Sequence, residues 1–249
     1  TANTQSEEHA GNFFRTTPDS LAVDDNGNAF WTYNVFTGNH AIDGVYSDLT
    51  AGTPVLTDTP VTGSDGGNNA GATSGVIGQR TDLSDEIYCG GVTMLDGYVA
   101  VIIANANLQV VYIRWYSSGG ATHVGISSTS YSHDIVDERA RVFLSGTSPN
   151  RRTHLITTSA SDTFLHHIYW DEGSLTAVAN NAITNTASTL IGASIFNDRG
   201  VVFYTHNTNA YPIYEVTGTV NGTPAWASPL TLFAGTATIT SDWLTGWNT

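Results

Sequence analysis

Asparagine, histidine and aromatic residues recur where apolar runs end, and these residue types could bind a sugar. Amide and imidazole groups bond vicinal hydroxyls, and aromatic rings stack on the C–H face of a sugar. The candidate ligand-binding residues are Trp31, Tyr33, Asn39, His40, Asn105, Asn107, His154, His206, Asn207 and Tyr211. Asn and His are also ordinary turn residues. Their recurrence, rather than any single member, predicts a binding site.

Two adjacent arginines, Arg151 and Arg152, are a second candidate site. The chain has 8 basic residues against 22 acidic ones, for a formal net charge of -14, and every basic residue is arginine. Adjacent guanidinium groups in such an acidic chain favour an anion site, for a uronate, sialate, sulfate or partner carboxylate. The alternative is that the arginines pair with local acids, for example Asp134, Asp137 and Glu138.

Metal and catalytic patterns are weak. His166 and His167 are adjacent on a predicted strand, so they face opposite sides and cannot share an ion. No cofactor is predicted, although four acids could assemble a calcium site or an acid/base pair: Asp65, Asp82, Asp85 and Glu86. No Gly-x-Ser-x-Gly elbow is present, and no catalytic residue is predicted.

Composition excludes several classes of protein. A lysine-free surface of this charge is unsuited to nucleic acid or to an anionic membrane face. The longest apolar stretch, 98–104, is shorter than the ~20 residues that span a bilayer. The single cysteine can form no intrachain disulfide. The acidic, lysine-free composition is typical of a salt-adapted protein or of a secreted or virion-surface protein, and both interpretations predict an extracellular location.

The elements that would position these residues are short strands. Turn residues interrupt every apolar run, and the runs are rich in Val, Ile, Tyr, Phe and Trp, which predicts an all-β chain. Four segments place a turn between two apolar strands: 21–31, 92–101, 134–144 and 193–204. Three of these share an acidic residue, a small residue two positions later and a phenylalanine: Asp25/Gly27/Phe30, Glu138/Ala140/Phe143 and Asp198/Gly200/Phe203.

Each hairpin is followed by an aliphatic–Tyr pair and then by a further strand. This order predicts four copies of a four-stranded unit, at approximately 20–57, 85–127, 131–180 and 188–234. Tandem four-stranded antiparallel units are typical of a β-propeller. We predict a single β-propeller domain over 1–249 with four or five blades, in which the termini close the ring. A β-sandwich is the alternative.

These turns resemble the aspartate-box turns of sialidase-like β-propellers, which pair an Asp and a Gly with a later aromatic residue. The Ser or Thr that opens a full box is replaced here by Val23, Val136 and Phe196. In that family the box is an element of the fold, so the resemblance implies architecture and no activity.

The repeat assignment indicates which loops to inspect for ligands. In a propeller the loops between the second and third strands of each blade line the binding face. Here they are predicted at 33–40, 104–107, 145–163 and 205–211. The third is much longer than the others and contains both arginines of the anion site. Long loops in compact folds usually carry function.

Three classes of function remain open from the sequence. The first is a non-enzymatic module that binds a glycan or a cell-surface receptor, as in an adhesin, a lectin or a virion spike. The second is a carbohydrate-active enzyme, which needs two or three converging carboxylates. The third is a structural module that assembles with copies of itself or with neighbouring proteins.

Overall fold

The computed structural model describes residues 21–37, 39–48, 55–58, 76–79, 88–104, 110–117, 122–126, 133–134, 140–159, 162–206 and 213–233. The elements in these ranges are β-strands and turns. Within them, no helix is long and apolar enough to cross a membrane. The chain divides into two compact units, Thr1–Tyr131 and Ser132–Thr249.

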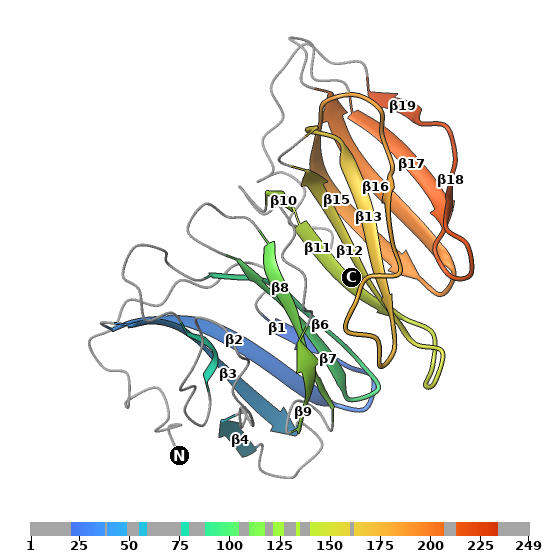
Figure 1. Cartoon of the computed structure of the whole chain (residues 1–249). Helices are drawn as coiled ribbons and strands as arrows, with labels where there is room; N and C mark the ends of the chain where they lie inside the picture. Colours follow the sequence, from blue (N-terminus) through green and yellow to red (C-terminus); the bar gives the residue numbers. More distant parts are fainter. Residues whose placement is uncertain are drawn as a thin grey trace. The chain divides into compact units, whose positions relative to one another are not determined.

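The first unit contains two antiparallel sheets, which we call sheets A and B (Figure 1). Sheet A has the order β1-β2-β3-β4, and β5 also pairs with β3. Its strands are β1 (Leu21–Val23), β2 (Asn28–Thr37), β3 (Asn39–Asp48), β4 (Val55–Asp58) and β5 (Val76–Gln79). Sheet B has the order β6-β7-β8-β9. Its strands are β6 (Tyr88–Leu95), β7 (Tyr98–Ala104), β8 (Val110–Ser117) and β9 (Thr122–Ile126).

The second unit contains sheets C and D. In sheet C, β12 pairs with β10 and β11 on one side and with β13 on the other, and β14 follows β13. Its strands are β10 (His133–Asp134), β11 (Ala140–Ser145), β12 (Arg152–Ser159), β13 (Leu165–Asp171) and β14 (Ala179–Ala182). In sheet D, β15, β16 and β17 pair in order, and β17 also pairs with β18 and β19. Its strands are β15 (Ser188–Phe196), β16 (Arg199–His206), β17 (Ile213–Thr219), β18 (Ala225–Trp226) and β19 (Leu230–Phe233).

The predicted fold class is confirmed. Each of the four described sheets is antiparallel and is built from consecutive stretches of the chain. A Greek-key sandwich would instead exchange strands between its sheets, whereas successive self-contained meanders are the pattern of β-propeller blades. The prediction that 1–249 form one ring closed by the termini stays a prediction, because residues 1–20 and 234–249 lie outside the described residues.

Three of the four predicted hairpins are present, at β1–β2, β6–β7 and β15–β16. The β6–β7 turn consists of Asp96 and Gly97, both with positive φ (49° and 71°). Two such residues are what a tight hairpin turn requires, because its backbone then follows the right-handed twist of the strands. The Asp-Gly pair therefore predicts this turn from sequence alone.

The predicted third hairpin is wrong. β10 (His133–Asp134) and β11 (Ala140–Ser145) do not pair with each other, because both pair with β12. The hairpin is formed by β11 and β12, and its tip is residues 146–151. Gly146 has φ of 73° there, and the N–H of Asn150 donates to the carbonyl of Thr147 at 2.8 Å. The glycine, proline and asparagine in this segment therefore mark a turn between strands, and β12 occupies the middle of the predicted long loop.

Two smaller predictions also fail. The predicted loop at 33–40 is largely paired strand, since the β2–β3 ladder continues to Thr37 opposite Asn39. Gly200 was expected at a hairpin tip, but it lies in β16 opposite Ile195. The tip is formed by Asn197, with φ of 53°, and Asp198. Gly200 therefore does not form the turn, and the side chain of Trp226 packs closely against it instead.

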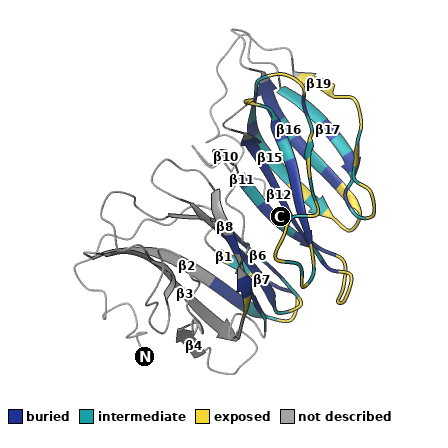
Figure 2. Ribbon diagram, viewed as in Figure 1, coloured by how far each residue is buried: buried dark blue, intermediate teal, exposed yellow. Residues whose placement is uncertain are grey.

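Buried apolar residues follow the strands, and exposed residues follow the turns (Figure 2). In β7 the residues from Val99 to Ile102 are all fully buried, as expected for a continuous apolar run covered on both faces. In the second unit, a core between sheets C and D contains Ile156, Leu165, Leu190, Val202, Tyr204 and Val216. This core fixes which face of sheet C meets sheet D.

Candidate functional site

The structure describes eight of the twelve predicted ligand residues. Four of them lie in paired strands of sheet A: Trp31, Tyr33, Asn39 and His40. His206 is the last residue of β16. Four others lie outside the described residues: Asn105, Asn107, Asn207 and Tyr211. Arg151, Arg152 and His154 are close together in the second unit, where the turn at 146–151 enters β12.

The β11–β12 ladder decides where these three side chains point. Ser145 pairs with Arg152, and successive residues of a strand face opposite sides of the sheet. Arg152, His154 and Ile156 share one face, and Ile156 belongs to the core between sheets C and D. Arg151 therefore faces the other side.

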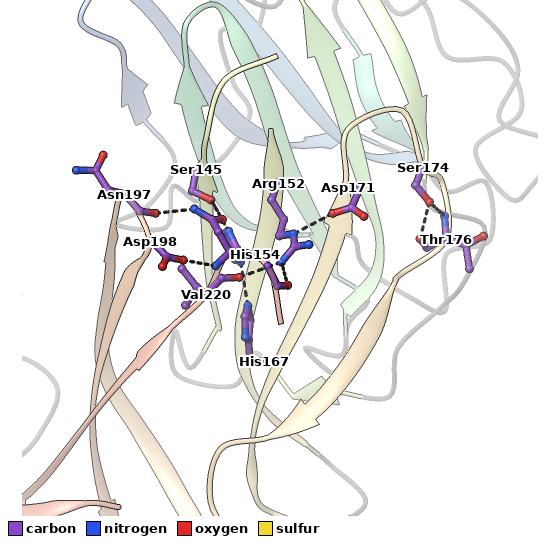
Figure 3. A network of polar contacts seen from close by, with 12 residues as sticks. Ser145, Arg152, His154, His167, Asp171, Ser174, Thr176, Asn197, Asp198 and Val220 are labelled. Carbon is purple, nitrogen blue, oxygen red and sulfur yellow. Dashed lines mark hydrogen bonds and ion pairs between the residues drawn. The ribbon is translucent and has the colours of Figure 1, made fainter. Parts of the chain in front are cut away.

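Arg152 links the two sheets through its guanidinium. Its Nε donates to Oδ1 of Asp171 at 2.9 Å, and its Nη1 donates to the carbonyl oxygens of Val220 at 3.1 Å and Gly222 at 2.7 Å (Figure 3). Its Cζ lies 4.1 Å from the centroid of the Tyr169 ring, in cation–π contact. One planar group thus holds β12, β13 and the turn after β17.

Arg151 is also paired. Its Nη1 lies 3.1 Å from Oε1 of Glu172, and both side chains are largely covered. The two arginines thus hold carboxylates of adjacent residues, Asp171 and Glu172, on opposite faces of β12. This arrangement fits the alternative of local pairing, with different acids from those expected. The anion site at these arginines stays a prediction.

Two histidines form the centre of the polar cluster. His154 and His167 are fully buried, and Nδ1 of His154 lies 2.9 Å from Nε2 of His167 (Figure 3). Their rings stack with centroids 5.1 Å apart. The ladder explains the contact: His154 is opposite Tyr169 and His167 is opposite Ile156, so the histidines are diagonal neighbours on one face.

The hydrogen-bond directions follow from Asn221. Its Nδ2 donates to the carbonyl oxygen of Asn197 at 3.1 Å, so its Oδ1 accepts the Oγ–H of Ser145 at 2.7 Å. Ser145 has then spent its proton and must accept from Nε2–H of His154, at 2.7 Å. Nδ1 of His154 consequently accepts from Nε2–H of His167. Every hydrogen bond in this row of side chains is formed while both rings are neutral.

These directions decide what the cluster can do chemically. A serine beside a histidine resembles a nucleophile beside its base, but a base must accept the serine proton. Here His154 donates to Ser145, and Ser145 is only 3% exposed. The row Ser145–His154–His167 is therefore a hydrogen-bond chain that joins strands. We call these three residues with Arg152 and Asn221 the polar junction.

Burial strongly disfavours charge on both imidazoles. Burial, reinforced by the positive charge of Arg152, lowers the pKa of His167 to about 4. Burial, then His167 and then Arg152 hold the pKa of His154 well below its usual value of 6.5. Among the described residues, Nδ1 of His167 has no hydrogen-bond partner. An incoming proton would find an open lone pair there and no carboxylate to neutralise it.

Trp226 closes the junction from sheet D. Its indole meets the His167 ring edge to face, with centroids 5.6 Å apart. The indole lies on two glycines that are opposite each other in the β16–β17 ladder, Gly200 and Gly218. A Cβ on Gly218 would lie 2.9 Å from the indole, and one on Gly200 would lie 2.8 Å from it. Both glycines are thus required by close approach of a ring, which no turn pattern predicts.

A second polar cluster lies near the surface, where the β12–β13 connection meets β14. Nε2 of His166 lies 3.0 Å from Oδ2 of Asp162, and its Nδ1 lies 2.7 Å from Oδ1 of Asn180. The side chain of Asp162 is 38% exposed and that of His166 is 12% exposed. We call these three residues the surface cluster. His166 and His167 do face opposite sides of β13, as predicted.

No group of three or more His, Cys, Asp or Glu side chains in the described part of the chain is arranged to hold a metal ion. The four acids considered for a calcium site or an acid/base pair lie outside that part: Asp65, Asp82, Asp85 and Glu86.

Sequence reasoning missed Ser145, Asn221 and Asp162 as partners of the histidines. The amide of Asn221 bridges Ser145 and Asn197, which are both far from it in the sequence. The correct β11–β12 register pairs Ser145 with Arg152. It also places His154 on the same face of the sheet as these two residues. The turn residues at 146–150 were the available signal for that register.

Comparisons with known proteins bear on the fold. No family model and no curated protein matches the chain. Among solved structures, the Hadza microbial sialidase Hz136 is 11% identical over 90% of this chain and 46% of its own, with a TM-score of 0.48. The NanB sialidase from Streptococcus pneumoniae is 13% identical over 78% of this chain and 29% of its own, with a TM-score of 0.41.

Hydrazine synthase of Kuenenia stuttgartiensis is 9% identical over 88% of this chain and 67% of its own, with a TM-score of 0.47. Sialidases, whose propellers the aspartate-box turns resemble, are among the matching structures. The chain spans less than half the length of either sialidase. These similarities concern the path of the chain alone.

Proposed function

We propose that the chain is a non-enzymatic module that binds a glycan displayed on a cell surface, and that it acts outside the cell or on a virion surface. The observation that carries this proposal is the surface cluster. An acid, an imidazole and an amide are held in fixed geometry by mutual hydrogen bonds, with Asp162 open to solvent. These are the groups that bond sugar hydroxyls.

The buried polar groups support a binding role over catalysis. The only serine–histidine row in the described residues is buried, and its proton order leaves His154 unable to act as a base. The acidic, lysine-free composition supports the extracellular part of the proposal and a salt-adapted protein. We do not propose sialate as the ligand, because the guanidinium groups of Arg151 and Arg152 already hold carboxylates of the chain.

A glycan array with the full chain, followed by a cell-binding assay at low and molar salt, tests this function. We expect one class of neutral glycan to bind, and binding to fall at least tenfold in Asp162→Ala and His166→Ala. The matched control is Arg199→Gln, an exposed change at the β15–β16 hairpin, which should bind as the unaltered chain does. Failure to bind any glycan or cell would contradict the proposal, and so would turnover of a bound sugar.

The remaining alternatives have their own measurements. A carbohydrate-active enzyme would release product from a glycan substrate. A structural module would assemble, so size-exclusion chromatography with mass measurement at molar salt would show a defined oligomer. Either result in the absence of glycan binding would replace the proposed function.

A further inference from the structure

Three contacts join sheet C to sheet D at one end of their interface. Ser145 donates to Asn221, Arg152 donates to the carbonyls of Val220 and Gly222, and His167 meets the edge of Trp226. An apolar core also lies between the two sheets, and the backbone N–H of Ser188 in β15 donates to the carbonyl of Thr163 at 2.9 Å. The polar junction is the part of this interface that contains titratable side chains in a hydrogen-bonded row.

These hydrogen-bond directions are consistent with only one placement of the protons. Ser145 donates to Asn221, and each histidine donates through Nε2. Nδ1 of His154 accepts a hydrogen bond, whereas Nδ1 of His167 has no partner among the described residues. A proton on Nδ1 of His154 would remove the acceptor for His167. A proton on Nδ1 of His167 would place a buried donor where the described residues provide no acceptor.

Among the described residues, the carboxylates near the histidines are engaged by other groups. On β12 the charged neighbour is Arg152, and on β13 it is Asp171, which already holds Arg152. Sheet D contributes Trp226, whose ring contacts His167, and the β15–β16 turn contributes Asp198, whose Oδ1 accepts from the backbone N–H of Asn221.

The remaining titratable neighbours do not change this balance. Tyr169 lies beside His167 in β13, with ring centroids 5.7 Å apart, and its ring carries the Arg152 guanidinium. In β16 and β17, Tyr204 stacks on Tyr214. Glu215 alternates with the buried Val216, so it lies on the opposite face of β17. Arg141 of β11 adds a further positive charge and donates to the carbonyl of Ala140.

We propose that the His154–His167 pair is an acid-sensitive latch, which holds sheets C and D together while both rings are neutral and opens the polar junction when either ring takes a proton. An added proton meets the positive charge of Arg152, and it also disrupts the hydrogen-bond order that reaches Asn221. The contacts to the turn after β17 are then lost first. This inference is independent of the proposed glycan-binding function.

The latch has a defined pH window. The two rings have lowered pKa values in the folded chain, whereas unfolded or opened rings titrate near 6.5. The open form therefore binds more protons below pH 6.5, and the closed form loses its advantage as pH falls from 6.5 toward 4. For His167 alone this predicts an increase of about 20-fold in the opening equilibrium between pH 7 and pH 5.

Amide hydrogen exchange of the full chain, corrected for the intrinsic pH dependence of exchange, measures this opening. The reporters are the N–H groups of Val220 and Asn221, which donate to the backbone carbonyl and the side chain of Asp198. We expect their protection to fall by about 20-fold or more between pH 7 and pH 5. Protection in the middle of β16 should change much less over the same range.

The decisive variant is His154→Leu combined with His167→Leu, which removes both partners of the buried bond and replaces them with apolar groups of similar size. Its protection at Val220 should be independent of pH between 7 and 5. The matched control is His166→Gln, one residue away on the opposite face, which should keep the full response to acid. An equal response in the double variant and in the unaltered chain would overturn the proposal.

A measurement on the unaltered chain keeps the proposal testable if the double variant does not fold. Nitrogen chemical shifts of the imidazole rings distinguish the two neutral tautomers and the charged form. We expect His154 and His167 both to be neutral with the proton on Nε2 at pH 5.5. A charged ring or a proton on Nδ1 at that pH would overturn the latch.

Discussion

At the scale of single residues, a hydrogen-bond chain replaces the catalytic and anion sites that the same residue types could form. Ser145 and His154 are the residue types of a nucleophile and base, yet Asn221 determines that protons run the other way. Arg152 is the residue type of an anion site, yet its Nε and Nη1 donate to Asp171 and to two carbonyls. The chemistry that each of these side chains can perform is therefore determined by its hydrogen-bond partners rather than by its residue type.

The hydrogen-bond chain predicts a specific cost for removing Ser145. In Ser145→Ala, Nε2–H of His154 and Oδ1 of Asn221 each lose a partner at a buried or half-buried position. We expect the free energy of unfolding to fall by about 2–3 kcal/mol, measured by urea denaturation.

Ser174→Ala is the matched control for Ser145→Ala. Ser174 bonds only to the nearby backbone of Thr176 near the surface, so its loss should change the unfolding free energy by less than about 0.5 kcal/mol. Equal effects in the two variants would show that the buried hydrogen-bond chain does not stabilise the fold.

Asp24, rather than its neighbour Asp25, is the acid that binds the backbone of the first hairpin turn. The sequence pattern indicated Asp25, which is exposed, whereas the carboxylate of Asp24 accepts backbone N–H groups of Asn26, Asn28 and Gly97. The bond to Gly97, at 2.7 Å, joins the first hairpin of sheet A to that of sheet B. Burial would raise the pKa of Asp24, but the bonds from Asn28, Gly97 and Asn26 outweigh it and lower the pKa.

These bonds predict the effect of Asp24→Ala. Three backbone donors lose their acceptor, so we expect a loss of about 1–2 kcal/mol in unfolding free energy at pH 7. Because the folded pKa is lowered below 3.8, the native carboxylate stabilises the fold above that value and loses this contribution as pH falls below it. The difference between the two proteins should therefore shrink in acid. Asp25→Ala should change stability by less than about 0.5 kcal/mol at either pH.

At the scale of elements, the packing of Trp226 on two glycines determines how sheet D can vary. A Cβ on Gly218 would lie 2.5 Å from the carbonyl oxygen of Ala225, which is backbone and cannot move aside. One on Gly200 would meet only side chains, those of Trp226 and Val220. One on Gly192 would meet nothing within 4 Å.

Three alanine substitutions should therefore differ in cost. Gly192→Ala should be neutral to within about 0.5 kcal/mol, whereas Gly218→Ala should destabilise the chain by about 3 kcal/mol. Gly200→Ala should cost about 2 kcal/mol alone and much less in a Trp226→Leu background. Thermal unfolding of the three single variants, of Trp226→Leu alone and of its combinations with Gly200→Ala and with Gly218→Ala measures this order. Rescue of Gly218→Ala by Trp226→Leu would contradict the backbone clash.

How far the sequence predicted these elements depends on the local signal. The β6–β7 turn was predictable because Asp96 and Gly97 both favour positive φ. The β11–β12 hairpin was not, because β10 and β11 share one partner strand and the tip was interpreted as the start of a long loop. Without that strand pairing the contact between His154 and His167 could not be predicted, because it exists only in the correct register.

In the surface cluster, too, the features that depend on neighbouring residues could be predicted, and those that depend on pairing of distant strands could not. The opposite facing of His166 and His167 follows from strand alternation alone and was predicted. The bond from His166 to Asn180 requires the β13–β14 ladder, which pairs His166 with Ala182 and so brings β14 alongside. No local pattern specifies that ladder, because it depends on how the chain returns after residue 171.

At the scale of the whole molecule, a formal charge of -14 opposes the compact state by self-repulsion. Salt screens this repulsion over a distance of about 10 Å at 0.1 M. We therefore expect the thermal unfolding midpoint to rise steadily between 0.05 and 1 M sodium chloride, which would also support the proposed salt adaptation. Repeating the series with a large neutral osmolyte in place of salt separates screening from solvent exclusion. A midpoint that is independent of salt would contradict the expected role of charge.

The contact of Trp226 with its two glycines has a consequence for how related sequences should diverge. Positions 200, 218 and 226 share one volume, since Gly200 and Gly218 are opposite each other and the indole covers both. Relatives that keep a tryptophan at 226 should keep glycine at the other two positions. Relatives with a small side chain at 226 should accept alanine or serine at 200 but still glycine at 218. These three positions should therefore covary in an alignment, and glycine at 192 should vary independently of them.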